Sequence, residues 1–170
     1  MSETTLKKMN KMTLETEGET HVIVRRRFAA APEAVYRAHT EPKLIQQWLL
    51  GPEGWVMPVC VNEARPGGKF RYEWTKADGS QGFHITGEIL EMEPGRRIVH
   101  VERMHLPDPT PDNRVETRFD RDGAGTLMTM RMTLPDAATR AMMLGTGMDK
   151  GMEMSYARLE EKVLGVKAFA

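Results

Sequence analysis

His100, Glu102 and His105 form the one cluster in this 170-residue chain in which side chains able to bind a metal or move a proton lie close together. Imidazole and carboxylate groups can act as metal ligands, and they can also act as an acid and base pair. His100 and Glu102 are two residues apart in a predicted strand and therefore share one face of it. The prolines of segment 105–112 make the connection after His105 stiff and exposed. We therefore predict no metal site and no cofactor, and we keep His100 and Glu102 as polar groups of a candidate binding site.

The chain shows no pattern typical of a catalytic nucleophile. Its serines are Ser2, Ser80 and Ser155. None of them lies in a Gly-x-Ser-x-Gly nucleophile elbow. The single cysteine, Cys60, is interpreted as a small buried hydrophobic residue, and one cysteine cannot form an internal disulfide, which favours a reducing, cytoplasmic location. The candidate acid and base groups of an enzyme are then Tyr72, His100 and Glu102.

Apolar side chains on several predicted elements are placed to enclose a cavity. Methionine is abundant, at 14 residues against five Phe, three Tyr and three Trp, and its flexible side chain adapts to ligands of varied shape. Alternating residues of the last strand and a stripe of the last helix would face each other, with the inner residues of other strands beside them. The candidate ligand-binding residues are Arg26, Phe70, Tyr72, Trp74, Phe83, Ile85, His100, Glu102, Met128, Met130, Met132, Leu144, Met148, Met152 and Tyr156. The alternative is that these side chains form a close-packed core without space for a ligand.

Arg26 lies between Val24 and Phe28 in the first predicted strand, on a face that is otherwise apolar. If that face is the inner one, Arg26 needs a carboxylate partner or an anionic group of a ligand, because an unpaired buried charge is costly. Tyr72 and Tyr156 can each present a hydroxyl group to a ligand or to a buried carbonyl oxygen.

The elements that position these residues follow from hydrophobic periodicity and turn signals. Polar residues 1–19 are predicted to be a mobile tail, residues 20–165 one domain, and residues 166–170 a carboxyl-terminal tail. The predicted elements are strands over 20–28, 55–62, 69–75, 81–92, 98–104, 114–120 and 126–134, two short helices beginning at 32 and 42, and one long helix over about 136–164. Pro58 is expected to make its strand an edge or irregular strand. Gly145, Gly147 and Gly151 interrupt the helical pattern and are expected to allow a bend or a close approach.

This order predicts an α+β fold in which a curved antiparallel sheet of about seven strands surrounds a long carboxyl-terminal helix. The 24 basic residues balance the 24 acidic ones, which argues against a nucleic-acid partner. No run of 18 apolar residues is present, so we expect no membrane span. Apolar residues from 48 to 55 are expected either to form a homodimer contact or to cover the mouth of a cavity. The sequence is therefore compatible with both a monomer and a homodimer.

Several motifs resemble one known family, the activator of heat-shock-protein-90 ATPase homologue, carboxyl-terminal-domain-like proteins. They are Arg26-Arg27-Phe28 followed by Ala31-Pro32, Thr40-Glu41-Pro42 with Trp48 and Gly51-Pro52, the hairpin Glu63-Ala64-Arg65-Pro66-Gly67-Gly68-Lys69-Phe70, and Gly151-Met152 with Leu159-Glu160. Met152 stands where the family usually has tryptophan. The resemblance covers about residues 20–165 and implies a helix-grip fold of the START-like, birch-allergen-like type, with a hydrophobic cavity between sheet and terminal helix.

Members of this superfamily include ligand carriers, aromatase/cyclases and a co-chaperone domain, so the resemblance implies fold more than activity. We rank three hypotheses. The first is non-catalytic binding of a small hydrophobic ligand, lipid-like or aromatic. The second is an aromatase/cyclase- or hydrolase-like enzyme that uses the same cavity. The third is a protein-interaction module of co-chaperone type, with a chaperone as its partner.

Overall fold

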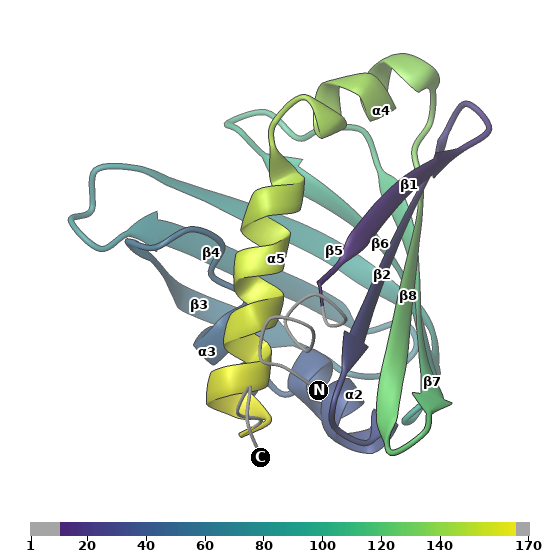
Figure 1. Cartoon of the computed structure of the whole chain (residues 1–170). Coiled ribbons are helices and arrows are strands. Elements are labelled where there is room, and N and C mark those ends of the chain that lie inside the picture. The colour runs from purple at the N-terminus through teal and green to yellow at the C-terminus, as the bar shows by residue number, and fades with distance from the viewer. Residues whose placement is uncertain (1–10, 166–170) are drawn as a thin grey trace.

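The computed structural model describes residues 11–165, which form one strongly curved antiparallel sheet with helices on its concave side (Figure 1). The eight strands follow the order β1-β2-β8-β7-β6-β5-β4-β3 across the sheet. The elements are β1 (Thr13–Glu17), β2 (His21–Phe28), α2 (Pro32–Thr40), α3 (Pro42–Trp48), β3 (Trp55–Asn62), β4 (Lys69–Lys76), β5 (Gly82–Glu93), β6 (Arg97–His105), β7 (Asn113–Asp122), β8 (Gly125–Thr133), α4 (Ala137–Leu144), α5 (Met148–Arg158) and the π-helical turn η1 (Leu159–Val163). The predicted α+β fold, with its seven strands and two short helices after the first of them, is confirmed.

The sheet has an eighth strand, β1, in a segment that was predicted to be part of a mobile tail. Residues 13–17 pair antiparallel with β2, so that Leu14 lies opposite Val24, and Arg25 Nη1 donates to Glu15 Oε1 at 2.8 Å. The prediction was wrong here because one half-buried leucine among polar residues gives almost no periodic signal, and the pairing depends on the edge that β2 offers. The rest of the predicted amino-terminal tail, residues 1–10, and the carboxyl-terminal tail 166–170 lie outside the described residues.

Strand β3 is at the opposite edge of the sheet, as the proline in it predicted. Its register with β4 shifts between Val56 and Val59, on either side of Pro58. Proline cannot donate a hydrogen bond to a neighbouring strand, so an edge position with an irregular register accommodates it.

The long terminal helix is broken where one continuous helix was predicted. Helix α4 ends at Leu144, and α5 begins at Met148 after a turn in which Gly147 has φ +75°. Residues with a side chain rarely adopt this left-handed conformation, so glycine there allows the chain to change direction between the two helices. Gly151 stays helical instead, and an added Cβ there would lie 3.6 Å from Pro52 Cδ, which makes it the close-approach site that was expected of one of these glycines. No helix within residues 11–165 is long and apolar enough to cross a membrane.

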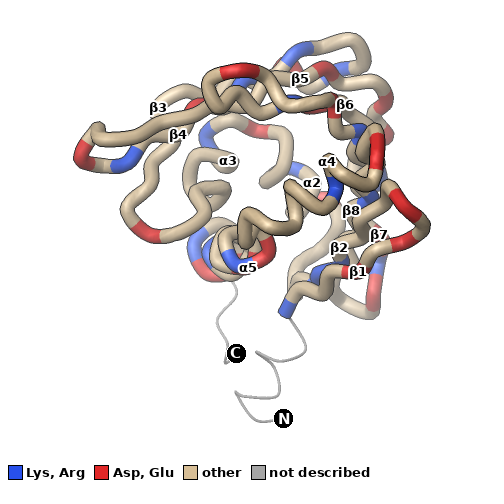
Figure 2. Tube along the Cα trace, turned by 90° about the horizontal axis from the view of Figure 1, so that it is seen from above, with Lys and Arg blue, Asp and Glu red and all other residues tan. Residues whose placement is uncertain are grey.

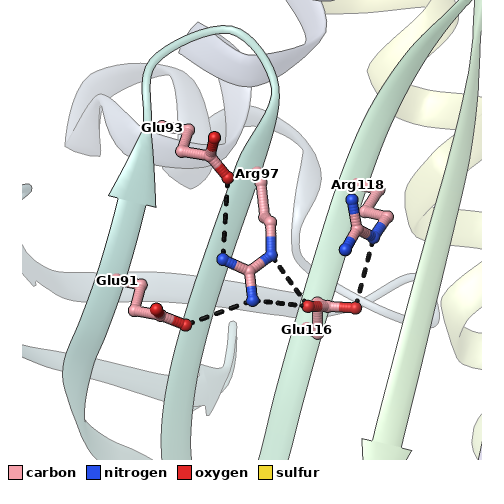
Figure 3. A network of polar contacts seen from close by, with 5 residues as sticks. All are labelled: Glu91, Glu93, Arg97, Glu116 and Arg118. Carbon is pink, nitrogen blue, oxygen red and sulfur yellow. Dashed lines mark hydrogen bonds and ion pairs between the residues drawn. The ribbon is translucent and has the colours of Figure 1, made fainter.

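The convex face of the sheet is polar, and this fixes which face holds the core. Arg97 on β6 forms ion pairs with both neighbouring strands (Figure 3). Its Nη2 lies 2.7 Å from Glu116 Oε2 on β7 and 3.1 Å from Glu91 Oε2 on β5. Glu116 in turn accepts a bond from Arg118 at 3.3 Å. These cross-strand pairs occupy the solvent side, so the alternate residues of the same strands point into the concave side.

Two hydrophobic clusters fill different parts of the concave side. The larger one joins β2, β7 and β8 to α2 and to the end of α5, and includes Phe28, Val35, Met128 and Leu159. The smaller one consists of Ile45, Met57 and Trp74, where α3 meets β3 and β4. Seen from above, the sheet forms an arch, and α5, viewed along its axis, stands at its open side (Figure 2).

Candidate ligand-binding cavity

A cavity of about 360 Å³ lies between the concave face of the sheet and α5. Its wall includes members of both hydrophobic clusters, Ile45 and Trp74 from the smaller one and Trp48 and Phe119 from the larger. A void of this size is uncommon in a close-packed interior. Twelve of the fifteen candidate residues line it, namely Phe70, Tyr72, Trp74, Phe83, Ile85, His100, Glu102, Met130, Met132, Met148, Met152 and Tyr156.

Three candidate residues do not line the cavity. Met128 faces inward but is fully buried in the larger cluster. Leu144 is the last residue of α4. Because the chain turns between α4 and α5, Leu144 does not continue the stripe of side chains that α5 presents to the cavity. Arg26 faces the interior beside the carboxyl-terminal end of α5, where it is held by ion pairs.

One wall of the cavity is a row of aromatic rings that crosses three strands. Every second residue of β4 points inward, so Phe70, Tyr72 and Trp74 stand side by side, with ring centroids 5.2 and 6.1 Å apart. Trp74 stacks on Phe83 of β5 at 5.0 Å, and Phe70 meets His100 of β6 edge-on at 5.2 Å. Such offset and edge-to-face pairs hold each ring in a fixed orientation.

Helix α5 supplies the opposite wall. Met148, Met152 and Tyr156 lie four residues apart on one stripe and all three line the cavity. Ser155 Oγ accepts a hydrogen bond from Gly51 N at 2.9 Å, and Arg158 donates to the carbonyl oxygens of Trp48 and Gly51 at 3.0 Å each. These bonds fasten the loop after α3 to the helix and set the width of the cavity at that end.

The apolar residues expected near the cavity mouth or a dimer contact are less exposed than predicted. Trp48 is buried, and its Nε1 donates to Ala38 O at 2.9 Å. Leu49 lines the cavity, and Leu50 and Trp55 are half-buried against the smaller cluster. Trp48 and Leu49 are therefore part of the cavity wall, whereas Leu50 and Trp55 pack against the smaller cluster and do not line the cavity.

A histidine and a carboxylate form a pair inside this apolar wall. His100 Nε2 donates to Glu102 Oε1 at 2.7 Å, and both residues line the cavity. The shared strand face predicted for them is confirmed. His105 lies elsewhere, bonded to Thr86 Oγ1 at 2.9 Å and stacked on His84 at 4.2 Å. Within residues 11–165 no three His, Cys, Asp or Glu side chains are grouped so that they could hold a metal ion.

Both tyrosine hydroxyl groups in the wall stay protonated. Burial raises the pKa of Tyr72 and of Tyr156 well above its ordinary value, and the nearby charge of Glu102 acts in the same direction on both. Tyr72 Oη accepts a hydrogen bond from Asn62 Nδ2 at 2.9 Å. Each phenol is therefore a neutral group that can donate a hydrogen bond within the cavity.

His39 is a polar wall residue that the sequence analysis did not select. Its Nδ1 donates to Val35 O at 2.7 Å, which leaves Nε2 as a hydrogen-bond acceptor, buried and without a partner among the described residues. The ring lies between Trp48 and Phe119, and burial lowers the pKa of His39 to about 4. Its helical position beside Val35 was readable from the sequence, but nothing local indicated that this side faced a hollow.

Arg26 has the carboxylate partners that a buried arginine was expected to need. Nη1 lies 3.0 Å from Glu160 Oε1, and Nη2 lies 3.4 Å from Glu153 Oε1. Its side chain is 2% exposed, and Nη1 also donates to Arg27 O at 2.7 Å. Burial raises the pKa of Glu160 although Arg26 opposes this effect. The cluster attaches α5 and η1 to strand β2.

Cys60 lies on β3 and is half-buried. Burial raises the pKa of its thiol to about 11, so at neutral pH the thiol carries its proton and is a weak nucleophile. This agrees with the interpretation of Cys60 as a small hydrophobic residue and not a nucleophile, although the residue is less buried than predicted.

Comparisons with known proteins identify the family. The family model described as "Activator of Hsp90 ATPase homolog 1-like protein" matches residues 29–163. A crystal structure of a protein from Rhodobacter sphaeroides is similar, at 28% identity and a TM-score of 0.84, covering 92% of this chain and 100% of that one. Protein CV1439 from Chromobacterium violaceum gives 25% identity and a TM-score of 0.71, over 85% of this chain and 96% of that one. Comparison with curated proteins gave no match. On the family match, the chain belongs to the Activator of Hsp90 ATPase homolog 1-like family.

Proposed function

We propose that this protein binds a small, largely apolar ligand in the cavity between the sheet and α5. The observation that carries the proposal is the cavity itself, whose volume is about 360 Å³. An apolar cavity of about 150 Å³ is enough to hold a benzene molecule. A ligand of two or three fused or linked rings, or a hydrocarbon chain of similar volume, would fit the larger space.

The residues of the wall suit this purpose better than they suit a stable empty core. Each unfilled volume costs stability, because the side chains around it lose van der Waals contacts. Met130, Met132, Met148 and Met152 line the void, and their flexible side chains can move to fit ligands of different shape. The aromatic row opposite them offers flat faces for stacking.

The variant Ile85→Trp is expected to abolish binding of the uncharged dye N-phenyl-1-naphthylamine, whose fluorescence rises in apolar surroundings. Ile85 lines the cavity, so the larger indole would fill space that the dye needs. We expect the dissociation constant to rise by at least about 100-fold, equivalent to about 2.7 kcal/mol. Fluorescence titration measures it, and circular dichroism checks the fold.

Leu90→Trp is the matched control, because Leu90 lies on the same strand but is 46% exposed on the outside. It should bind the dye as the unmodified protein does. The proposal is contradicted if both variants bind the dye equally well. It is also contradicted if the unmodified protein binds no dye and native mass spectrometry detects no retained small molecule.

A second candidate function, acid–base catalysis in the same cavity, is supported by the contact between His100 and Glu102. Within the apolar wall, an imidazole hydrogen-bonded to a carboxylate has the arrangement of a general base and the group that orients it. The neutral ester 2-naphthyl acetate tests it through release of fluorescent naphthol. Catalysis predicts that His100→Gln lowers kcat by at least about 100-fold and that Glu73→Gln, outside the cavity, does not. Hydrolysis no faster than in buffer would contradict ester hydrolysis by this pair.

A further inference from the structure

The charge of the cavity wall restricts what can bind in it. Among the described residues that line the cavity, Glu102 is the only one with a formal charge, and none is lysine or arginine. Its partner His100 can at most neutralise it. The carboxylate of Glu102 is therefore the only charged group that the wall turns to a ligand, with no lysine or arginine of the described lining to offset it.

The arginines that approach the wall from outside are already engaged. Arg26 is paired with the carboxylates of Glu153 and Glu160. Arg158 donates to the backbone oxygens of Trp48 and Gly51. Neither guanidinium group could turn to a ligand anion without leaving buried acceptors unpaired, which is costly.

The polar atoms of the wall that have no hydrogen-bond partner among residues 11–165 include two acceptors. Glu102 shares one carboxylate oxygen with His100, and its Oε2 has no hydrogen-bond partner among residues 11–165. His39 Nε2 is a buried acceptor without a partner in the same part of the chain. The field of Glu102 already disfavours a negative charge on Tyr72 and on Tyr156, and it would act in the same way on an anionic ligand.

Given the proposed ligand-binding function, we infer that the cavity selects apolar ligands whose polar head group donates hydrogen bonds, a hydroxyl or an amine, and rejects carboxylates. Glu102 receives the donor, and the aromatic row holds the apolar body. A protonated amine gains further from the faces of the surrounding rings. A carboxylate would be desolvated in a wall that offers it no cation.

Four ligands with one shared ring system test the inference by displacement of N-phenyl-1-naphthylamine at neutral pH. They are naphthalene, 2-naphthalenemethanol, 2-naphthylmethylamine and 2-naphthoate. We expect the alcohol and the amine to bind at least as tightly as naphthalene, and 2-naphthoate to bind at least about 30-fold more weakly, because a buried ionised group without a partner is strongly disfavoured.

Substitutions in the cavity wall test whether Glu102 is the group that causes this preference between head groups. Glu102→Gln should weaken binding of the amine by at least about 10-fold more than it weakens binding of naphthalene. It should also reduce the difference in affinity between 2-naphthalenemethanol and 2-naphthoate. Glu73→Gln, on the outer face of β4 beside Arg71, is the matched control and should change neither. Met104→Lys adds a cation to the wall and should favour 2-naphthoate, which tests the charge argument should Glu102→Gln fail to fold.

The outcomes separate the two proposals. If 2-naphthoate binds as tightly as the alcohol, or if Glu102→Gln leaves the preference unchanged, the head-group inference is wrong while ligand binding stands. If neither the dye nor naphthalene binds to the folded protein, the proposed ligand-binding function is wrong and the inference fails with it.

Discussion

Gly87→Ala is expected to lower the free energy of unfolding by about 3 kcal/mol, at the upper end of what overpacking a core costs. Gly87 is buried on β5, directly opposite Phe70 of β4, and the Phe70 ring covers it. A Cβ on Gly87 would overlap this ring and the carbonyl oxygen of Val101 on β6. The ring can move, but the backbone oxygen belongs to a paired strand. Urea unfolding at equilibrium measures the change.

The same substitution should weaken ligand binding, because Phe70 lines the cavity and a displaced ring would alter the wall beside His100. Glu88→Ala is the matched control, since Glu88 is the next residue, points outward and pairs with Arg103. It should cost less than about 1 kcal/mol. Adding Phe70→Leu to Gly87→Ala should restore part of the loss. A stability change no larger than that of Glu88→Ala would show that the overlap is relieved without cost.

Arg26→Leu is expected to lower the free energy of unfolding by about 3–5 kcal/mol at neutral pH, because it leaves two carboxylates near one another without their cation. Glu153 and Glu160 pair with Arg26 at 3.4 and 3.0 Å, and their side chains are 23% and 14% exposed. Arg25→Leu is the matched control on the same strand. Arg25 forms a surface ion pair with Glu15, so its loss should cost at most about 1 kcal/mol.

The loss caused by Arg26→Leu should shrink as the pH falls. Burial already raises the pKa of Glu160 in the folded protein, and removal of the guanidinium raises it further. A carboxyl group with a raised folded-state pKa binds its proton more tightly in the folded than in the unfolded state. Its stabilising contribution is complete below the unfolded pKa and is lost as the pH rises through the folded one.

Urea unfolding at about pH 7 and pH 5 should therefore give a smaller deficit at the lower pH. Arg26→Leu combined with Glu160→Gln should recover a large part of the stability at pH 7, because it removes one of the unpaired charges. A deficit that is independent of pH and unaffected by Glu160→Gln would show that Arg26 acts through packing against Phe28, over whose ring it lies at 5.0 Å, and not through charge.

Features that depend on the local geometry of one strand were predictable from the sequence. Successive side chains of a strand point to opposite faces, so the inward row Phe70, Tyr72 and Trp74 and the shared face of His100 and Glu102 followed from spacing alone. The need of Arg26 for a carboxylate followed from the apolar residues on either side of it. Twelve of the fifteen candidate residues line the cavity for the same reason.

Features that depend on the distance between remote segments required the tertiary structure. Met128 and Met130 share a face of β8, yet only Met130 borders the hollow, because the curvature of the sheet and the position of α5 decide where packing ends. The break at Gly147, the pairing of β1 and the contribution of His39 have the same origin. Hydrophobic periodicity indicates which way a side chain points from its own helix or strand. A cavity is the space that remains between separate elements, and its size is determined by contacts between residues far apart in the chain.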